Sequence, residues 1–162
     1  MTPLHHLRAG IIGTGFIADV IAHALRGTTE VTLNAVASRR AETAFAFSLR
    51  HGSVPVLESW ESLLESGTVD AVYVATPTSV REPICLAAAA KGLAVLADKP
   101  FLNRDSLQRI TQACTQAGVA FLDGSKVLTT GTALTFDGTS LGLNAGAANF
   151  KVGATGDTSQ HY

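Results

Sequence analysis

The sequence is poor in charge and in cysteine, and these scarcities exclude several classes of protein. Only 15% of its 162 residues are charged, and 12 Lys and Arg against 13 Asp and Glu give a net charge of −1. That balance offers no basic surface, so we expect no nucleic-acid partner. The two cysteines, Cys85 and Cys114, are too few for a disulfide framework or, by themselves, for a zinc site. We expect reduced thiols and no bound metal.

Long uninterrupted apolar runs are also missing, although 46% of the residues are hydrophobic and the mean hydropathy is +0.26. Asp19, Lys91 and Asp98 interrupt the apolar stretches, and none reaches the roughly 20 residues that cross a bilayer. The N-terminal run after Arg8 contains glycines and lacks a small-x-small cleavage site, which is unlike a signal peptide. We therefore predict a soluble, cytoplasmic chain without a membrane partner.

Apolar runs of strand length alternate with helix-length segments over the first three-quarters of the chain. The expected strands cover 9–13, 31–37, 54–57, 70–75, 93–97 and 119–122, and the expected helices cover 16–25, 40–51, 60–65, 79–91 and 103–117. This alternation predicts a doubly wound α/β (Rossmann) fold, a parallel sheet with helices on both faces, over residues 1–124. Within it, Ser79 and Glu82 have the spacing of a capping box, and Asn103 or Asp105 is placed to cap the last helix.

The composition changes after Gly124. Seven of the 15 glycines lie in residues 124–162, together with many Thr, Ser and Asn residues and few charges. Apolar residues alternate with small or polar ones on both sides of Asp137-Gly138, which predicts a β-hairpin. Residues 125–162 are therefore expected to form a Gly/Thr-rich β tail that is too short for a core of its own. Such a tail packs on the first domain, pairs with another copy of the chain in a homo-oligomer, or stays loose, and the sequence leaves these three open.

A glycine-rich turn joins the first expected strand to the first expected helix. Residues 13–18 read G-T-G-F-I-A, where the first glycine permits a tight turn and the second lets a pyrophosphate approach the backbone. Ala18 takes the third small position, where the helix packs close to the sheet, and the helix N-terminus offers free N–H groups to phosphates. The strand–turn–helix context favours a dinucleotide site over a structural turn. The predicted contacts here are Gly13, Thr14, Gly15, Phe16 and Ile17.

Residues 38–40 stand where a dinucleotide site distinguishes NAD from NADP. An NAD-preferring site places Asp or Glu at the end of the second strand to hold the ribose hydroxyls. Here the residues are Ser38, Arg39 and Arg40, and a guanidinium can pair with a 2′-phosphate or stack on adenine. We therefore expect NADP as the cofactor, with NAD as the second choice. The alternative interpretation is that the two arginines are only the solvated start of the next helix.

Two further polar segments follow later strands, at the sheet edge where ligands of open α/β sheets bind. Thr76, Pro77 and Thr78 follow one expected strand, and Asp98 and Lys99 follow the next. The ammonium of Lys99 can bind a substrate hydroxyl and exchange a proton with it. By itself, however, a Lys-Pro pair at a strand end is more often structural than catalytic.

The chain resembles the glucose–fructose oxidoreductase/inositol dehydrogenase (Gfo/Idh/MocA) family over residues 7–124, through G-T-G-F-I-A, A-V-A-S-R-R, A-T-P-T-S and A-A-K-G-L-A-V-L-A-D-K-P in this order. The resemblance implies an NAD(P)-dependent oxidoreductase that transfers a hydride between nicotinamide and a hydroxyl of a sugar, cyclitol or polyol. It also implies that Lys99 lies beside the nicotinamide and contacts the reacting hydroxyl. By the same resemblance, Thr76, Pro77 and Thr78 line the cofactor cleft.

The sequence departs from that family in three respects. Asp98 replaces the usual Glu, which shortens the reach of the carboxylate, and Arg81 places a fixed positive charge near the cleft where a His is common. Family members continue into a second domain with most of the substrate contacts, so we expect cofactor binding to survive better than turnover in this truncated form.

Residues 126–162 resemble the β segments of bacteriophage tail-fibre proteins instead, which leaves a chimera, a frameshifted reading and a natural truncation open. The alternative function is a non-catalytic nucleotide-binding or assembly module fused to a β-structured tail.

Overall fold

The computed structural model describes residues 6–122, 128–129, 134–136, 141–145 and 148–152, and strands alternate with helices as far as residue 122. The strands of the main sheet are β1 (Leu7–Ile12), β2 (Val31–Ala37), β3 (Val56–Leu57), β4 (Ala71–Val74), β5 (Ala94–Ala97), β6 (Phe121–Leu122) and β7 (Leu128–Thr129). The helices are α1 (Phe16–Leu25), α2 (Ala41–Arg50), α3 (Trp60–Glu65), α4 (Thr78–Ala90) and α5 (Arg104–Ala117).

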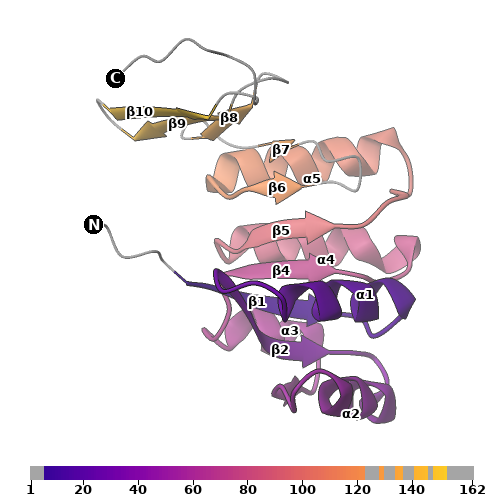
Figure 1. Ribbon diagram of the computed structural model, residues 1–162. Coiled ribbons are helices and arrows are strands. Elements are labelled where there is room, and N and C mark those ends of the chain that lie inside the picture. Colours follow the sequence, from indigo (N-terminus) through magenta and orange to yellow (C-terminus); the bar gives the residue numbers. More distant parts are fainter. Residues whose placement is uncertain (1–5, 123–127, 130–133, 137–140, 146–147, 153–162) are drawn as a thin grey trace.

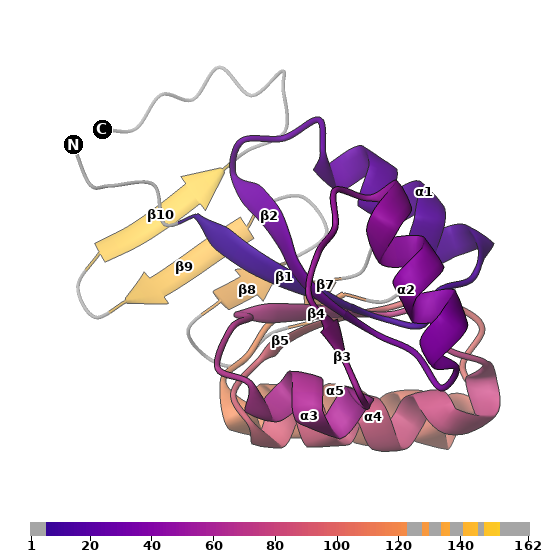
Figure 2. The same cartoon turned by 90° about the horizontal axis from the view of Figure 1, so that it is seen from below.

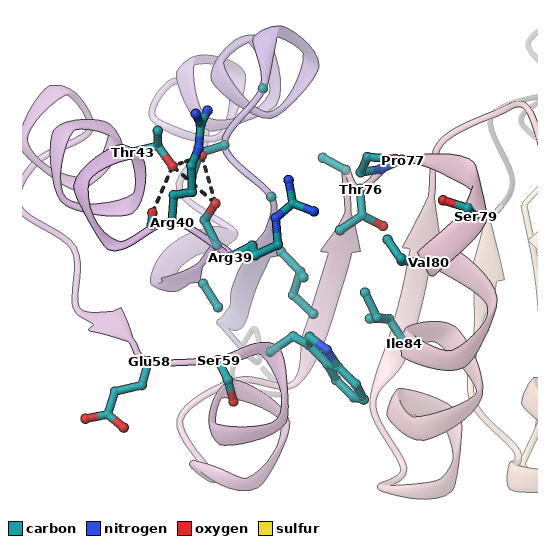
Figure 3. Close-up of a pocket in the computed structure, with 18 residues that line it drawn as sticks. Arg39, Arg40, Thr43, Glu58, Ser59, Thr76, Pro77, Ser79, Val80 and Ile84 are labelled. Carbon is teal, nitrogen blue, oxygen red and sulfur yellow. Dashed lines mark hydrogen bonds between the residues drawn. The ribbon is translucent and has the colours of Figure 1, made fainter.

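The strands of the main sheet lie in the order β3-β2-β1-β4-β5-β6-β7 (Figure 1). Neighbouring strands from β3 to β6 are parallel, and β7 pairs antiparallel with β6. The chain builds outward from β1 to β3 and then returns to the other side of β1 for β4. At such a reversal, ligands bind outside the carboxyl ends of the strands. Residues that follow β1, β2 and β4 line a cavity at this edge (Figure 3).

Helices cover both faces of the sheet (Figure 2), which confirms the predicted Rossmann fold. On one face α1 and α2 pack against the strands, and Phe47 of α2 is fully buried beside Ile11 and Val36. On the other face α3, α4 and α5 pack against the strands, and Leu63 and Ile110 are fully buried there. These two apolar layers hold the strand ends in fixed positions, so the loops that follow the strands start from a rigid base.

The two cysteines belong to the second of these layers. Cys85 of α4 and Cys114 of α5 are both fully buried and form no disulfide. Burial raises the pKa of the Cys85 thiol to about 12 and that of the Cys114 thiol to about 11. Both thiols are therefore protonated at neutral pH, and they pack as small hydrophobic groups.

The two predicted helix caps have different outcomes. Asn103 caps α5, because its Oδ1 accepts the backbone N–H of Ser106 at 2.8 Å. The capping box predicted for Ser79 and Glu82 is wrong, because α4 begins one residue earlier and Glu82 reaches a neighbouring helix. Its Oε1 lies 2.5 Å from Nε of Arg109 on α5. This ion pair between helices lowers the pKa of Glu82 to about 2 and replaces the local contact that the spacing predicted.

Beyond β7 the described strands are β8 (Leu134–Phe136), β9 (Leu141–Ala145) and β10 (Ala148–Val152). They pair antiparallel in the order β10-β9-β8. The predicted turn at Asp137-Gly138 lies outside the described residues. The division of the chain at residue 124 and the association of copies through the tail stay predictions. Among the described residues, no helix has the length and apolar character needed to cross a membrane.

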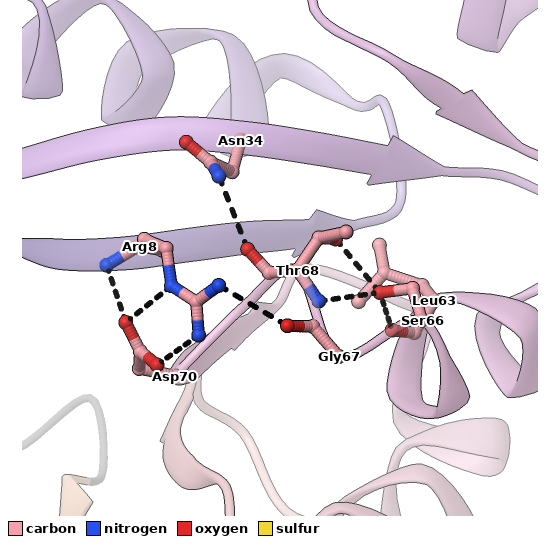
Figure 4. Close-up of polar contacts among 7 residues, drawn as sticks. All are labelled: Arg8, Asn34, Leu63, Ser66, Gly67, Thr68 and Asp70. Carbon is pink, nitrogen blue, oxygen red and sulfur yellow. Dashed lines mark hydrogen bonds and ion pairs between the residues drawn. The ribbon is translucent and has the colours of Figure 1, made fainter.

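An arginine–aspartate pair connects the starts of β1 and β4 (Figure 4). Arg8 Nη2 donates to Asp70 Oδ1 at 2.6 Å, and Arg8 Nε and the Arg8 backbone N–H donate to Oδ2 at 3.0 and 2.9 Å. These bonds lower the pKa of Asp70 from 3.8 to about 2. Because the pKa is lower in the folded state, the stabilisation is complete above the unfolded value and disappears as the pH falls through the folded value.

Replacing this carboxylate is expected to have a small and pH-dependent effect. Asp70→Asn should lower the free energy of unfolding by at most about 1 kcal/mol at neutral pH. The reason is exposure, since the Arg8 and Asp70 side chains are 43% and 38% exposed. Thermal melts of both proteins should show the difference shrinking between about pH 4 and about pH 2. A difference that does not change over that range would mean that the charge of Asp70 is not its cause.

Candidate functional site

The turn between β1 and α1 contains two glycines in different surroundings. Gly13 has a φ of +103°, and a Cβ atom there would lie 2.7 Å from the carbonyl oxygen of Ala75, which follows β4. Glycine at this position allows the backbones after β1 and β4 to approach each other. At Gly15 a Cβ atom would meet nothing within 4 Å. The second glycine therefore exposes its backbone to open space, as a site for a pyrophosphate requires.

The N-terminus of α1 adjoins this open space. Gly15 is the N-cap residue, and the first hydrogen bond of the helix runs from the Asp19 N–H to the Gly15 carbonyl. The N–H groups of Phe16, Ile17 and Ala18 accordingly have no partner within the helix. No side chain caps them, since the N-cap residue is a glycine. These N–H groups and the positive end of the helix dipole suit a phosphate group.

A cavity of about 740 Å³ extends along the carboxyl ends of β1, β2 and β4 (Figure 3). Figure 3 shows Arg39 and Arg40 on one side of it and Thr76 and Pro77 on the other. The glycine turn after β1 lies between them in the order of the sheet. The volume falls within the roughly 300–1,000 Å³ that is usual for small-molecule sites.

Of the thirteen predicted contact residues, eight line this cavity: Gly13, Thr14, Gly15, Ser38, Arg39, Arg40, Thr76 and Pro77. The remaining five, which are Phe16, Ile17, Thr78, Asp98 and Lys99, do not line it. The wall also includes residues that sequence reasoning missed, among them Thr43, Glu58, Ser59, Trp60, Ser79 and Val80. Most of these come from the starts of helices or from the short segment after β3, where no motif marks a ligand.

Three hydroxyl groups meet beside the two arginines. Thr14 Oγ1 lies 3.2 Å from both Ser38 Oγ and Thr43 Oγ1, and the last two atoms are 3.3 Å apart. Thr43 Oγ1 also donates to the Arg40 carbonyl at 2.9 Å, which fixes the cluster to the start of α2. Within the described part of the chain, neither Arg39 nor Arg40 forms an ion pair. Guanidinium and hydroxyl groups in this arrangement are the donors that a phosphate monoester requires.

Arg81 does not line the cavity but contacts the backbone at its β4 end. It links the backbone segment after β4 with the backbone segment after β5. The residue is 5% exposed. Its Nη2 donates to the Thr76 carbonyl at 2.6 Å, and its Nη1 donates to the Pro100 carbonyl at 2.5 Å and to the Asp98 carbonyl. The guanidinium thus connects the segment after β4 with the segment after β5. Lys99 lies on the second of these segments and is exposed, and its backbone N–H donates to Asp98 Oδ1 at 2.9 Å.

Residues 7–124 match the GFO_IDH_MocA family, described as an oxidoreductase family with an NAD-binding Rossmann fold. The chain belongs to this family. The match covers the segments on which the resemblance in the sequence was based, and it confirms that resemblance. The exposed glycine turn and the cavity at the carboxyl edge agree with the family's description as NAD-binding.

Curated relatives of this chain act on cyclitols and sugar nucleotides. The scyllo-inositol 2-dehydrogenase (NADP(+)) IolU of Bacillus subtilis is 29% identical over 121 residues, covering 74% of this chain and 37% of the relative. The dTDP-3,4-didehydro-2,6-dideoxy-alpha-D-glucose 3-reductase of Actinomadura kijaniata is 36% identical over 121 residues, covering 72% of this chain and 36% of the relative. The chain therefore spans little more than a third of the length of these relatives.

Solved structures of similar proteins contain either cofactor. GenD2 from gentamicin A biosynthesis, in complex with NAD, has a TM-score of 0.70 at 30% identity and covers 74% of this chain and 34% of its own. KijD10, a 3-ketoreductase from Actinomadura kijaniata in complex with NADP, has a TM-score of 0.68 at 34% identity. The match covers 72% of this chain and 38% of KijD10. The fold of this chain is thus one that binds NAD in some proteins and NADP in others.

Proposed function

We propose that this chain binds NADP(H) and serves as the cofactor domain of an oxidoreductase acting on a hydroxyl group of a sugar, cyclitol or polyol. One observation carries the proposal. A single cavity is lined by the open glycine turn, which ends at the N-cap residue of α1, and by two arginines that form no ion pair in the described part of the chain. The substrate class is supported by the names of the relatives, which are an inositol dehydrogenase and a reductase of a sugar nucleotide.

Successive parts of the cavity, taken along the edge of the sheet, suit successive parts of NADP. The pyrophosphate suits the N–H groups at the start of α1, where Gly15 leaves open space. The 2′-phosphate suits the end of β2, where Arg39 and Arg40 adjoin the hydroxyl cluster of Thr14, Ser38 and Thr43. With these two parts fixed, the residues after β4, which is the next strand beyond β1, would receive the nicotinamide end of the cofactor.

The preference for NADP over NAD follows from the charge at the end of β2. A site for NAD holds the ribose hydroxyls with a carboxylate there, and a carboxylate would repel a 2′-phosphate. The acidic residue in the wall of the cavity, Glu58, instead follows β3. Positive charge at the end of β2 favours the doubly charged phosphate monoester of NADP.

The chemistry of the reaction requires one proton donor or acceptor near the hydride. Bound nicotinamide supplies or accepts the hydride. Lys99 lies at the carboxyl end of β5, the neighbour of β4, and its side chain is exposed at that edge. We assign to its ammonium the role of binding the substrate hydroxyl and exchanging its proton. Asp98 accepts the Lys99 N–H and orients this segment rather than contacting the cavity.

Thermal-shift titrations with NADPH and NADH test the proposal. At a concentration about a hundredfold above Kd, bound NADPH should raise the free energy of unfolding by about 2.7 kcal/mol. Arg39→Ala should reduce the shift with NADPH and leave the smaller shift with NADH unchanged, because only NADPH carries the 2′-phosphate. The matched control is Arg104→Ala, which removes an exposed arginine at the start of α5, away from the cavity wall. An absence of shift with both cofactors, or equal shifts with NADPH in wild type and Arg39→Ala, would contradict the proposal.

A further inference from the structure

The guanidinium of Arg81 is buried, and its hydrogen-bond partners are uncharged backbone carbonyl groups. The residue is 5% exposed, and its Nε has no hydrogen-bond partner among the described residues. Its guanidinium lies 5.9 Å from the centre of the Phe101 ring. In the described part of the chain no carboxylate pairs with it. Burial of a charge without an opposite charge is costly, and an apolar side chain of similar size is often at least as stabilising. The contacts of Arg81 therefore need an explanation beyond stability.

The carbonyl groups that Arg81 binds belong to two segments, of which only the one after β4 lines the cavity. Thr76 follows β4 and lines the cavity, whereas Asp98 and Pro100 follow β5. The two segments also share one direct hydrogen bond, from Thr78 Oγ1 to the Pro100 carbonyl at 3.2 Å. The Asp98 N–H also donates to the carbonyl of Val74, the last residue of β4, at 3.5 Å, and the guanidinium supplies the other recorded hydrogen bonds between the strand ends. Its planar shape lets two nitrogen atoms bind both segments at once.

Nη1 of Arg81 binds the carbonyl groups on either side of Lys99. It donates to the carbonyl of Asp98 and to that of Pro100, at 2.5 Å from the latter. The backbone of Lys99 is thereby fixed at both ends, although the residue is exposed. The position from which Lys99 reaches outward depends on the contacts of Arg81.

These segments stand where the nicotinamide ring must lie if the proposed function holds. The sheet places β2, β1, β4 and β5 next to one another in that order. A cofactor with its 2′-phosphate at β2 and its pyrophosphate at β1 extends its other end toward β4 and β5. The segments that Arg81 connects would then contact the nicotinamide ring and not the adenosine end.

We propose that Arg81 is a positioning residue, which holds the segments 76–78 and 98–100 at the separation that receives the nicotinamide ring and that places Lys99 beside it. This inference rests on the proposed function. It predicts that the loss of Arg81 weakens binding of the ring alone. If the segments adopt the competent separation in only one molecule in ten without Arg81, the affinity for the ring-bearing cofactor falls about tenfold.

The test compares NADPH with 2′-phospho-ADP-ribose, which has the same phosphates and lacks the nicotinamide ring. Calorimetric titration of the full chain gives a Kd for each. In wild type, NADPH should bind more tightly. In Arg81→Met, the Kd for NADPH should rise about tenfold, while the Kd for 2′-phospho-ADP-ribose stays within about twofold. The control is Arg109→Met, which removes a half-exposed arginine from the same pair of helices and should change neither Kd.

A second variant keeps the inference testable if Arg81→Met fails to fold. Arg81→Lys retains the charge but has one nitrogen in place of a planar pair, so it should show the same selective loss to a smaller extent. Equal losses for both ligands, or an unchanged ratio of the two Kd values, would overturn the inference. Equal affinities of wild type for the two ligands would also overturn it, yet leave cofactor binding in place. A wild-type chain that binds neither ligand would contradict the proposed function itself.

Discussion

Gly15→Val is expected to lower the affinity for NADPH by about a hundredfold or more while the chain remains folded. A Cβ at Gly15 meets nothing within 4 Å in the protein, and the φ of −79° is one that any residue adopts. The protein therefore has room for the side chain. The ligand does not, because an isopropyl group would fill the space through which a pyrophosphate approaches the N–H groups of α1.

Thermal melts without ligand provide the control for this variant. Because valine is a poorer N-cap residue than glycine, the melts should show a loss of roughly 1 kcal/mol at most. Gly15→Ala should lie between wild type and Gly15→Val in affinity, since its side chain is smaller. Calorimetric titration of the three proteins with NADPH gives the order. An affinity in Gly15→Val equal to that of wild type would show that the phosphates do not bind at this turn.

Gly13→Ala is expected to act on the fold instead, and to destabilise it by about 3 kcal/mol or more. The φ of +103° is unfavourable for alanine, and the new Cβ would lie 2.7 Å from the carbonyl oxygen of Ala75. Because that oxygen belongs to the backbone, it cannot turn aside as a side chain does. The ends of β1 and β4 would have to separate. For a chain of this size the melting temperature should fall by on the order of 10 °C.

Gly118→Ala separates the two causes of that effect. Gly118 also has a positive φ, +69°, at the end of α5, but a Cβ there would meet nothing within 4 Å. Replacing it by alanine should therefore lower the free energy of unfolding only by the conformational strain, about 1 kcal/mol. Denaturant melts of both variants measure the difference. If the two variants lose the same amount, the close approach of Gly13 to Ala75 contributes nothing.

Much of the fold follows from local patterns in the sequence. The expected helix 16–25 and the expected strand 31–37 coincide with α1 and β2, because Gly15 and Gly27 bound the helix and β-branched and apolar residues fill the strand. The capping box at Ser79 failed for a physical reason. Glu82 lies within reach of Arg109, and an ion pair between distant parts of the chain competes with a local cap that spacing alone can predict.

The residues of the site likewise include some that a local motif predicts and some that only the folded chain brings together. The glycine turn and Arg39 lie in the cavity because a motif fixes their place at strand ends. Thr43 and Trp60 were missed, since they reach the cavity only through the packing of α2 and α3. The burial of Arg81 also carries no local signal, because its three carbonyl partners lie on segments that only the sheet order brings together.

A nuclear magnetic resonance titration of the isotope-labelled chain with NADPH tests most directly whether the carboxyl edge of the sheet binds the cofactor. If it does, backbone amide signals of Gly15, Phe16, Arg39 and Thr76 should shift in a saturable way. Signals of Gly92, at the opposite edge of the sheet before β5, should stay in place. Shifts confined to the amino edge of the sheet, or no shifts at saturating NADPH, would contradict the claim that the carboxyl edge binds the cofactor.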